Sequence, residues 1–359
     1  EKLEGDGAIQ DGAAISIVNR PGYKGLGKIA ITGGTFTAKG DNAAIKAYTW
    51  DSSTKQESAF DNSAKTVAIS GGTFSSAVAS DLCAEGYAPV ANTNGTYSVG
   101  VPVAQIDGNV YVTLADAVAA AEDGQTVTLL GDVEQNTQLT IDKSITLDLN
   151  GKTISNTVDI WGDNTNAILS ITKGAKVTIT GSGTIDAKEN DCYTINVIDG
   201  DLTIENGTFY GNVSVVQVQE GTLSVKGGTF DLHQKWEGGS QYLFNCIDDA
   251  YVSGSANVII SGGTFVGFDP NVSPEQKVDG KAPSFAAPGA GITKNEDGSF
   301  TAAAGMTAQI LDKDGNSVKA YKTLADAVAA AQDGQTVRLL ADVEQNTQLT
   351  IDKSITLDL

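Results

Sequence analysis

The sequence is poor in basic residues, histidine, cysteine, proline and methionine, and the shortage of basic residues argues against two classes of partner. Among 359 residues there are 23 Lys and Arg against 44 Asp and Glu, with 1 His, 3 Cys, 7 Pro and 1 Met, and the net charge is −21. Nucleic acids and anionic membrane surfaces bind basic faces and would repel this chain. The charge instead predicts a soluble, self-repelling, exposed surface.

The three cysteines, Cys83, Cys192 and Cys246, form neither a close pair nor a metal-binding motif. We expect each to pack as a small apolar residue, with a bridge between Cys192 and Cys246 as the less favoured alternative. No run reaches the 18 apolar residues or so of a membrane-spanning helix. The chain begins at Glu1 and stops at Leu359 inside a strand pattern, which predicts a fragment of a longer protein.

A 37-residue segment occurs twice in the chain, at residues 113–149 and 323–359. The copies differ at only three positions: Glu122 against Gln332, Thr128 against Arg338, and Gly131 against Ala341. Stalks and multivalent binders are often built from near-identical tandem copies, whereas active sites rarely are. The long repeat therefore favours a structural or adhesive role.

A shorter repeat is marked by the tripeptide Gly-Thr-Phe, which occurs at residues 34–36, 72–74, 207–209, 228–230 and 263–265. The spacing is 24 residues from Thr184, in a Gly-Thr-Ile variant, to Thr208, then 21 to Thr229 and 35 to Thr264. Alternating apolar and polar runs separated by glycines precede these tripeptides, which indicates short strands with one buried face. One such turn cannot bury a core alone, but stacked turns can.

The leading prediction is an all-β fold, a right-handed parallel β-helix, with an antiparallel sandwich as the less favoured alternative. Gly200 and Gly221 are expected at corners with positive φ, and the phenylalanines are expected to form an internal ladder. The insertions after Phe36, Phe230 and Phe265 become side loops. Two successive turns are predicted to point the following residues inward: Ile195, Val197, Leu202 and Ile204, then Val216, Val218, Leu223 and Val225.

One helix is predicted at residues 113–121, where Thr113 caps the first turn with Asp116 at the third position. A hairpin with Asp107-Gly108 at its turn precedes it, and the later copy has Asp314-Gly315 in a longer hairpin. Hairpin and helix together would cover the open end of a coil. We therefore predict the end of one unit at 1–100, a complete unit at 101–304 and the beginning of a third at 305–359. Segments near Asn94-Gly and Asp297-Gly are expected to close a coil.

Several segments resemble repeats in large surface proteins of gut Firmicutes. They include residues 69–76 (ISGGTFSS), 86–88 (GYA), 94–97 (NGTY), 113–118 (TLADAV) and 145–152 (ITLDLNGK). These repeats belong to the pectin-lyase-like β-helix superfamily. The resemblance implies a β-helix on an extracellular protein attached to the cell wall, and it names no ligand.

Some relatives of that fold are polysaccharide lyases or glycoside hydrolases, which makes an enzyme a further alternative. Lyases use an Arg or Lys base, yet the only arginines are Arg20 and Arg338. Asp248-Asp249 is a carboxylate pair, but the one histidine, His233, lacks flanking glycines. We interpret the pair as an acidic turn leading into a strand, and we predict that the chain is not an enzyme.

Metal binding has one weak candidate. Asp312, Asp314 and Asn316 alternate as in a calcium loop, but the glycine is out of phase and the final glutamate is missing. A hairpin turn explains the segment better, and no cofactor is expected.

Glycan contact is suggested by aromatic residues in the side loops. Trp50 and Trp236 follow Gly-Thr-Phe tripeptides, and Tyr242 and Trp161 occupy comparable segments. A flat apolar ring beside polar groups suits a sugar, although such rings also fold back to cover a coil. The sequence thus predicts a bacterial surface adhesin or stalk segment, monomeric within a longer array, that contacts host glycans or surface proteins. The alternative is a carbohydrate-binding module using its side loops.

Overall fold

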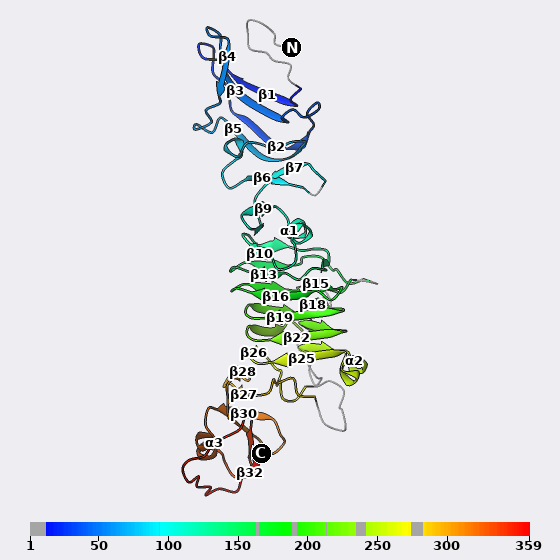
Figure 1. Cartoon of the computed structure of the whole chain (residues 1–359), viewed down its shortest axis with the longest axis vertical. Helices are drawn as coiled ribbons and strands as arrows, with labels where there is room; N and C mark the ends of the chain where they lie inside the picture. The colour runs from blue at the N-terminus through cyan, green and yellow to red at the C-terminus, as the bar shows by residue number, and fades with distance from the viewer. Residues whose placement is uncertain are drawn as a thin grey trace. The chain divides into compact units, whose positions relative to one another are not determined.

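The computed structural model describes residues 12–92, 94–162, 165–188, 192–212, 214–234, 242–273 and 283–359 (Figure 1). Its contacts divide the chain into two compact units, Glu1–Ala120 and Ala121–Leu359. Strands predominate and helices are few, so the all-β prediction is confirmed. Among the described residues, no helix is long and apolar enough to cross a membrane.

The first unit contains two small sheets, a 3-10 helix, a hairpin and a helix. In one sheet, β1 (Ile15–Asn19) pairs in parallel with β3 (Ile45–Asp51), which pairs antiparallel with β4 (Gln56–Ala59). In the other, β2 (Ile29–Phe36) and β5 (Val67–Phe74) are parallel, and β7 (Tyr97–Gly100) lies antiparallel between β5 and β6 (Ala88–Ala91). The remaining elements are η1 (Ser80–Leu82), β8 (Ala104–Ile106), β9 (Asn109–Tyr111) and α1 (Leu114–Ala120).

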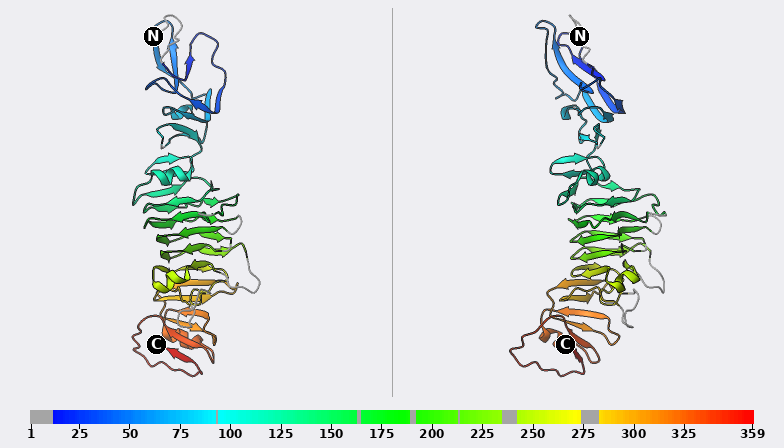
Figure 2. Two further views of the ribbon diagram at one scale, coloured as in Figure 1. Left: turned by 90° about the vertical axis from the view of Figure 1, so that its right-hand side faces the viewer. Right: turned by 45° about the vertical axis from the view of Figure 1, so that its right-hand side comes forward.

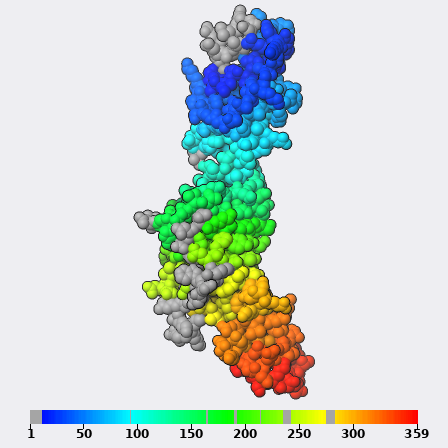
Figure 3. Space-filling model, turned by 180° about the vertical axis from the view of Figure 1, so that it is seen from behind, coloured from blue at the N-terminus to red at the C-terminus, as the bar shows by residue number. Residues whose placement is uncertain are grey.

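The second unit is dominated by three parallel sheets (Figures 1 and 2). Within each sheet, a strand pairs with the strand that comes three later in the chain. Sheet A contains β10 (Thr126–Leu129), β13 (Thr146–Asp148), β16 (Lys176–Thr180), β19 (Gly200–Ile204), β22 (Gly221–Val225) and β25 (Ala256–Ile260). Sheet B contains β11 (Val133–Glu134), β14 (Thr153–Ser155), β17 (Thr184–Asp186), β20 (Thr208–Gly211), β23 (Thr229–Leu232) and β26 (Gly263–Phe265). Sheet C contains β12 (Leu139–Ile141), β15 (Ala167–Ile171), β18 (Tyr193–Val197), β21 (Val216–Val218) and β24 (Phe244–Cys246). Long parallel sheets recurring in this order fit a solenoid, and in the space-filling view these coils (green to yellow) form one packed body (Figure 3).

The core of this stack consists of the apolar rows that the alternation predicted. Leu202 pairs with Leu223 and Ile204 with Val225 in the parallel register of β19 and β22. Parallel pairing places like side chains above one another, so each turn extends the apolar rows of the turn before. All eight residues predicted to point inward are at most 1% exposed: Ile195, Val197, Leu202, Ile204, Val216, Val218, Leu223 and Val225.

The phenylalanine ladder is confirmed. Phe209 and Phe230 stack with ring centroids 5.1 Å apart and planes 9° apart, and Phe230 and Phe265 stack at 5.3 Å and 9°. In the first unit, Phe36 and Phe74 stack at 5.0 Å. These offset-stacked rings add to the free energy gained from their burial.

The prediction for the two corner glycines is half correct. Gly221 has φ of +98°, in the region that glycine favours. Gly200 does not have positive φ, and it pairs with Gly221 inside the ladder of β19 and β22. A Cβ atom on Gly200 would lie 2.6 Å from the carbonyl oxygen of Ala175. Close backbone approach, not a left-handed conformation, therefore requires glycine at position 200.

Each of the two segments predicted to close a coil forms a hairpin, and the two hairpins are alike. In the second unit it consists of β27 (Ala290–Lys294) and β28 (Phe300–Ala304), and β28 pairs antiparallel with β26. Asn295 Nδ2 donates to Ser299 Oγ and Thr301 Oγ1, at 2.9 Å each. In the first unit, Asn92 Nδ2 bonds Thr96 Oγ1 at 2.8 Å and Ser98 Oγ at 3.0 Å. We call these two segments the closing hairpins.

The 37-residue repeat begins a similar structure in both places. A hairpin precedes each copy, and the later one consists of β29 (Ala308–Leu311) and β30 (Ser317–Tyr321). The helices α1 and α3 (Leu324–Ala330) follow, then β10 and β31 (Thr336–Leu339). β32 (Thr356–Asp358) pairs in parallel with β31. We call hairpin, helix and first strand the opening module.

The predicted helix and its cap are confirmed. The Asp116 N–H donates to Thr113 Oγ1 at 3.0 Å, and the Asp326 N–H donates to Thr323 Oγ1 at 3.1 Å. Each cap satisfies one of the free backbone donors at the helix start. The division into units at residues 100 and 304 stays a prediction, since the contacts separate the chain only after Ala120.

Candidate functional site

The structure describes three of the four aromatic residues predicted to contact glycans. Trp50 lies on strand β3 and is only 4% exposed, so it is a core residue and not a loop platform. Trp161 is 48% exposed and meets Tyr193 edge-on at 5.7 Å. Tyr242 is 38% exposed and lies just before β24, and Trp236 lies outside the described residues. Trp161 and Tyr242 precede strands of sheet C that are three steps apart, about 14 Å.

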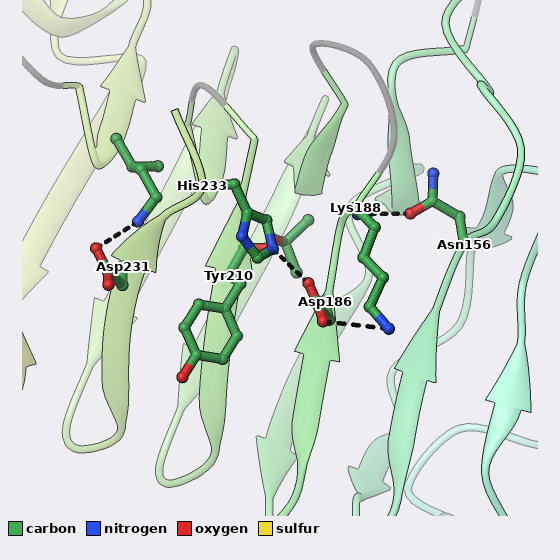
Figure 4. A network of polar contacts seen from close by, with 8 residues as sticks. Asn156, Asp186, Lys188, Tyr210, Asp231 and His233 are labelled. Atoms are coloured by element: carbon green, nitrogen blue, oxygen red, sulfur yellow. Dashed lines mark hydrogen bonds and ion pairs between the residues drawn. The ribbon is translucent and has the colours of Figure 1, made fainter. Parts of the chain in front are cut away.

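A polar cluster that the sequence analysis missed lies on the outer face of sheet B (Figure 4). The His233 ring nitrogen Nε2 lies 2.6 Å from Asp186 Oδ1, two turns away. Tyr210 lies on the intervening strand β20, and its ring stacks on the His233 ring with centroids 5.5 Å apart. The strand register aligns Asp186 with Tyr210 and Tyr210 with Asp231.

Two further residues extend this cluster to an adjacent turn. Lys188 Nζ lies 3.6 Å from Asp186 Oδ2, and the Lys188 backbone N–H donates to Asn156 Oδ1 at 2.9 Å (Figure 4). Asn156 is fully buried, whereas the side chains of Lys188 and His233 are 49% and 41% exposed. Two hydrogen bonds and the stacking of Tyr210 on His233 thus link four successive turns, and the charged groups at the surface remain accessible to water.

Part of this cluster could have been predicted from the sequence, because three of its residues occupy the same position in successive repeats. Asp186, Tyr210 and Asp231 each follow the threonine of a Gly-Thr-Phe or Gly-Thr-Ile tripeptide by two positions. Because neighbours in a parallel ladder share a phase, residues at one offset form a row on one face. Aligning the tripeptides would therefore have predicted the row. It would not have predicted that His233 contacts Asp186 two turns away.

The carboxylate pair Asp248-Asp249 is not the acidic turn that we predicted. Both residues lie exposed in the first turn of helix α2 (Asp248–Ser253), which ends at Gly254 with φ of +80°. Carboxylates near the N-terminus of a helix interact favourably with its dipole. The alternating run before Cys246 gave no helical pattern, which is why the short helix escaped prediction.

The cysteines are buried thiols and not disulfides. Burial is the main cause that raises the pKa of Cys192 to about 12, and it also raises the pKa of Cys83. Thiols with raised pKa carry little thiolate at neutral pH and are poor nucleophiles.

The suspected calcium loop is a hairpin turn. Asp312 Oδ1 accepts the backbone N–H groups of Asp314 and Asn316, at 2.9 Å each, and Asp312 Oδ2 accepts Asn316 Nδ2 at 3.0 Å. These bonds, with the Asn316 side chain first, lower the pKa of Asp312. Within the described ranges, no group of three or more His, Cys, Asp or Glu side chains could hold a metal ion.

The closing hairpin of the second unit packs against the opening module that follows it, and we call this contact the joint. The buried Ser317 hydroxyl lies at its centre: it donates to Asp269 Oδ1 at 2.9 Å and accepts from Gln309 Nε2 at 2.9 Å and Asn271 Nδ2 at 3.0 Å. Gln309 Oε1 in turn accepts the Ile292 N–H of β27 at 3.1 Å. Ser317 and Gln309 are 2% and 0% exposed.

The comparisons with known proteins do not identify the chain. No family model matches it, and no match was found among curated proteins or among solved structures.

A cleft of about 470 Å³ lies beside the joint. The turn of the closing hairpin lines it with Lys294, Glu296 and Phe300, and the opposite hairpin contributes Asn316 and Val318. This volume is within the range of about 300–1,000 Å³ that is usual for small-molecule sites. The joint therefore has two features with functional potential, a buried polar contact and an open cleft.

Proposed function

We propose that the chain is part of a bacterial cell-surface stalk or adhesin in which successive right-handed parallel β-helix units follow one another. The observation that carries the proposal is the joint, where a closing hairpin packs directly on the next opening module. β27 and β30 are in extensive contact there. Gln309 accepts the Ile292 N–H of β27, and Ser317 bonds Asp269 in the segment that follows β26. A joint with a buried, fully bonded polar centre holds one orientation. Such joints turn repeated units into a stiff spacer.

The right-handed coil follows from a general preference of parallel strands. Crossover connections between parallel strands of one sheet are right-handed in about 98% of cases. Each turn of this stack makes such a connection through the other two sheets. We therefore assign the same handedness to every turn.

The location at the cell surface rests on two supports. The repeats resemble those of surface proteins of gut Firmicutes, and the net charge of −21 suits an exposed, soluble surface. Contact with host glycans or host surface proteins, repeated along the array, would multiply weak affinities. We propose no catalytic role.

A carbohydrate-binding module is the second candidate function. It is favoured by Trp161 and Tyr242, which expose aromatic surface near one sheet of the stack. Substitution of both residues by alanine should abolish glycan-array binding if this candidate is correct, and should leave it unchanged if the side loops only cover the coil.

Antibodies against the second unit test the proposed location. On intact cells of the source organism, immunogold should label the surface, and brief trypsin treatment before fixation should remove the label. Labelling that requires permeabilised cells would contradict the proposal.

A further inference from the structure

The cleft beside the joint combines the features of a sugar site. Phe300 and Val318 give it apolar surface, and both are only partly buried. Aromatic and aliphatic surface of this kind packs against the C–H face of a pyranose ring. Lys294 stands over the Phe300 ring, with Nζ 5.8 Å from its centroid, so a cation lies beside the apolar floor.

The charged groups at the mouth of the cleft are available to a ligand. Lys294 and Glu296 are exposed, and neither side chain bonds another side chain among the described residues. An ammonium donates hydrogen bonds and a carboxylate accepts them. A sugar hydroxyl can do both, so adjacent hydroxyls of one ring can satisfy both groups.

The deeper carboxylates are already occupied by the protein. Asp269 accepts the Ser317 N–H and hydroxyl, at 2.9 Å each. Asp312 accepts the backbone N–H groups of Asp314 and Asn316 and the Asn316 side-chain amide within its own turn. With Glu296 they leave the cleft with more negative than positive charge. A polyanionic chain such as a pectic acid would be repelled.

We propose that this cleft binds a neutral hexose unit of a polysaccharide. The inference rests on the proposed surface function and adds a ligand class and a place to it. The ligand would bridge the closing hairpin and the opening module, because residues of both line the cleft.

The earlier opening module lacks the residues that form one wall of the cleft. Only Asp107 and Gly108 join β8 to β9, whereas residues 312–316 join β29 to β30. The five-residue turn contributes Asp312 and Asn316 to the cleft. Ligand binding is thus a property of the longer hairpin and not of every opening module.

The test uses the full chain and three neutral hexasaccharides of gluco, manno and galacto configuration. Calorimetry and saturation-transfer NMR should detect binding of at least one. Lys294→Ala and Glu296→Gln should each weaken it about tenfold, the effect of losing one charge-assisted hydrogen bond. Both residues are exposed, so these variants should fold.

Lys319→Ala is the matched control, because Lys319 also stands over a ring, that of Tyr321 at 5.6 Å, but does not line the cleft. It should bind as the unchanged chain does. The proposal is overturned if no neutral hexasaccharide binds, or if only an acidic oligogalacturonate binds. It is also overturned if Lys294→Ala and Glu296→Gln both bind as tightly as the unchanged chain. None of these results would alter surface labelling of cells, so failure here is distinct from failure of the stalk proposal.

Discussion

Nε2 of His233 lies 2.6 Å from Oδ1 of Asp186, although 47 positions separate the two residues in the chain. The contact is possible because two turns of the stack bring their strands within about 10 Å of each other. Tyr210, on the intervening strand, fills the space below the histidine ring. The single histidine of the chain therefore links turns that are not adjacent.

Loss of this link should have a measurable but modest effect. We expect His233→Ala to lower the free energy of unfolding by about 0.5–1.5 kcal/mol, the usual contribution of one hydrogen bond. Urea unfolding followed by circular dichroism measures it. Lys226→Ala is the control, because among the residues that the structure describes the Lys226 side chain forms a single exposed pair, 3.6 Å from Glu205, and such pairs contribute little. Equal stability of the two variants would mean that the His233 contact contributes nothing.

The phenylalanine ladder should contribute far more. Phe230 is fully buried between Phe209 and Phe265 and also meets Phe244 edge-on. Phe230→Ala should cost about 3–5 kcal/mol through lost burial and an internal cavity. Thr229→Ala, at the exposed neighbouring position, should cost about 0.5 kcal/mol. Thermal unfolding of both variants decides this, and a similar melting temperature for the two would contradict the ladder.

Glycine is required at position 221 for two reasons. Its φ is +98°, and an added Cβ would overlap the carbonyl oxygen of Gly200. Gly221→Ala should therefore cost about 1–2 kcal/mol for the backbone alone, and more for the overlap. Gly174→Ala isolates the backbone effect, because φ is +69° there and no atom of the described residues lies within 4 Å of the added atom. If both variants lose equal stability by chemical denaturation, the close approach of the strands is wrong.

The hairpin turn at Asp312 should respond to acid. Hydrogen bonds from Asn316 and from backbone N–H groups hold the folded-state pKa of Asp312 below its ordinary value of 3.8. The stabilisation is therefore complete at neutral pH and is lost as pH falls below 3.8 through the folded-state pKa. NMR titration of the carboxyl carbon should give a midpoint below 3.8, and Asp312→Asn should remove this part of the acid dependence. A midpoint at or above 3.8 would show that the turn is not closed by these bonds.

Much of the stack could be predicted because its physics is local and repeated. The alternation that places Leu202 and Leu223 inward occurs in every turn, and the capping pair Thr113 and Asp116 lies within four residues. Where a feature depended on contacts between turns, prediction was weaker. The need for glycine at position 200 comes from the backbone of Ala175, in the preceding turn.

The candidate sites were less predictable than the fold. Trp50 was expected in a loop, but it lies in the core on strand β3, which pairs with β1 and β4. The joint depends on Ser317 reaching Asp269, 48 positions earlier. Neither contact has a sequence pattern, because each is made once and at long range.

The distance between two spin labels across the joint tests the stiff-array account most directly. Lys226→Cys on the stack and Gln332→Cys after helix α3 place labels at exposed positions of the second unit, while the native thiols are buried. Pulsed electron paramagnetic resonance should give one narrow distance distribution, which Ser317→Ala should broaden by removing the centre of the joint. A broad or multiple distribution in the chain with Ser317 intact would contradict the account.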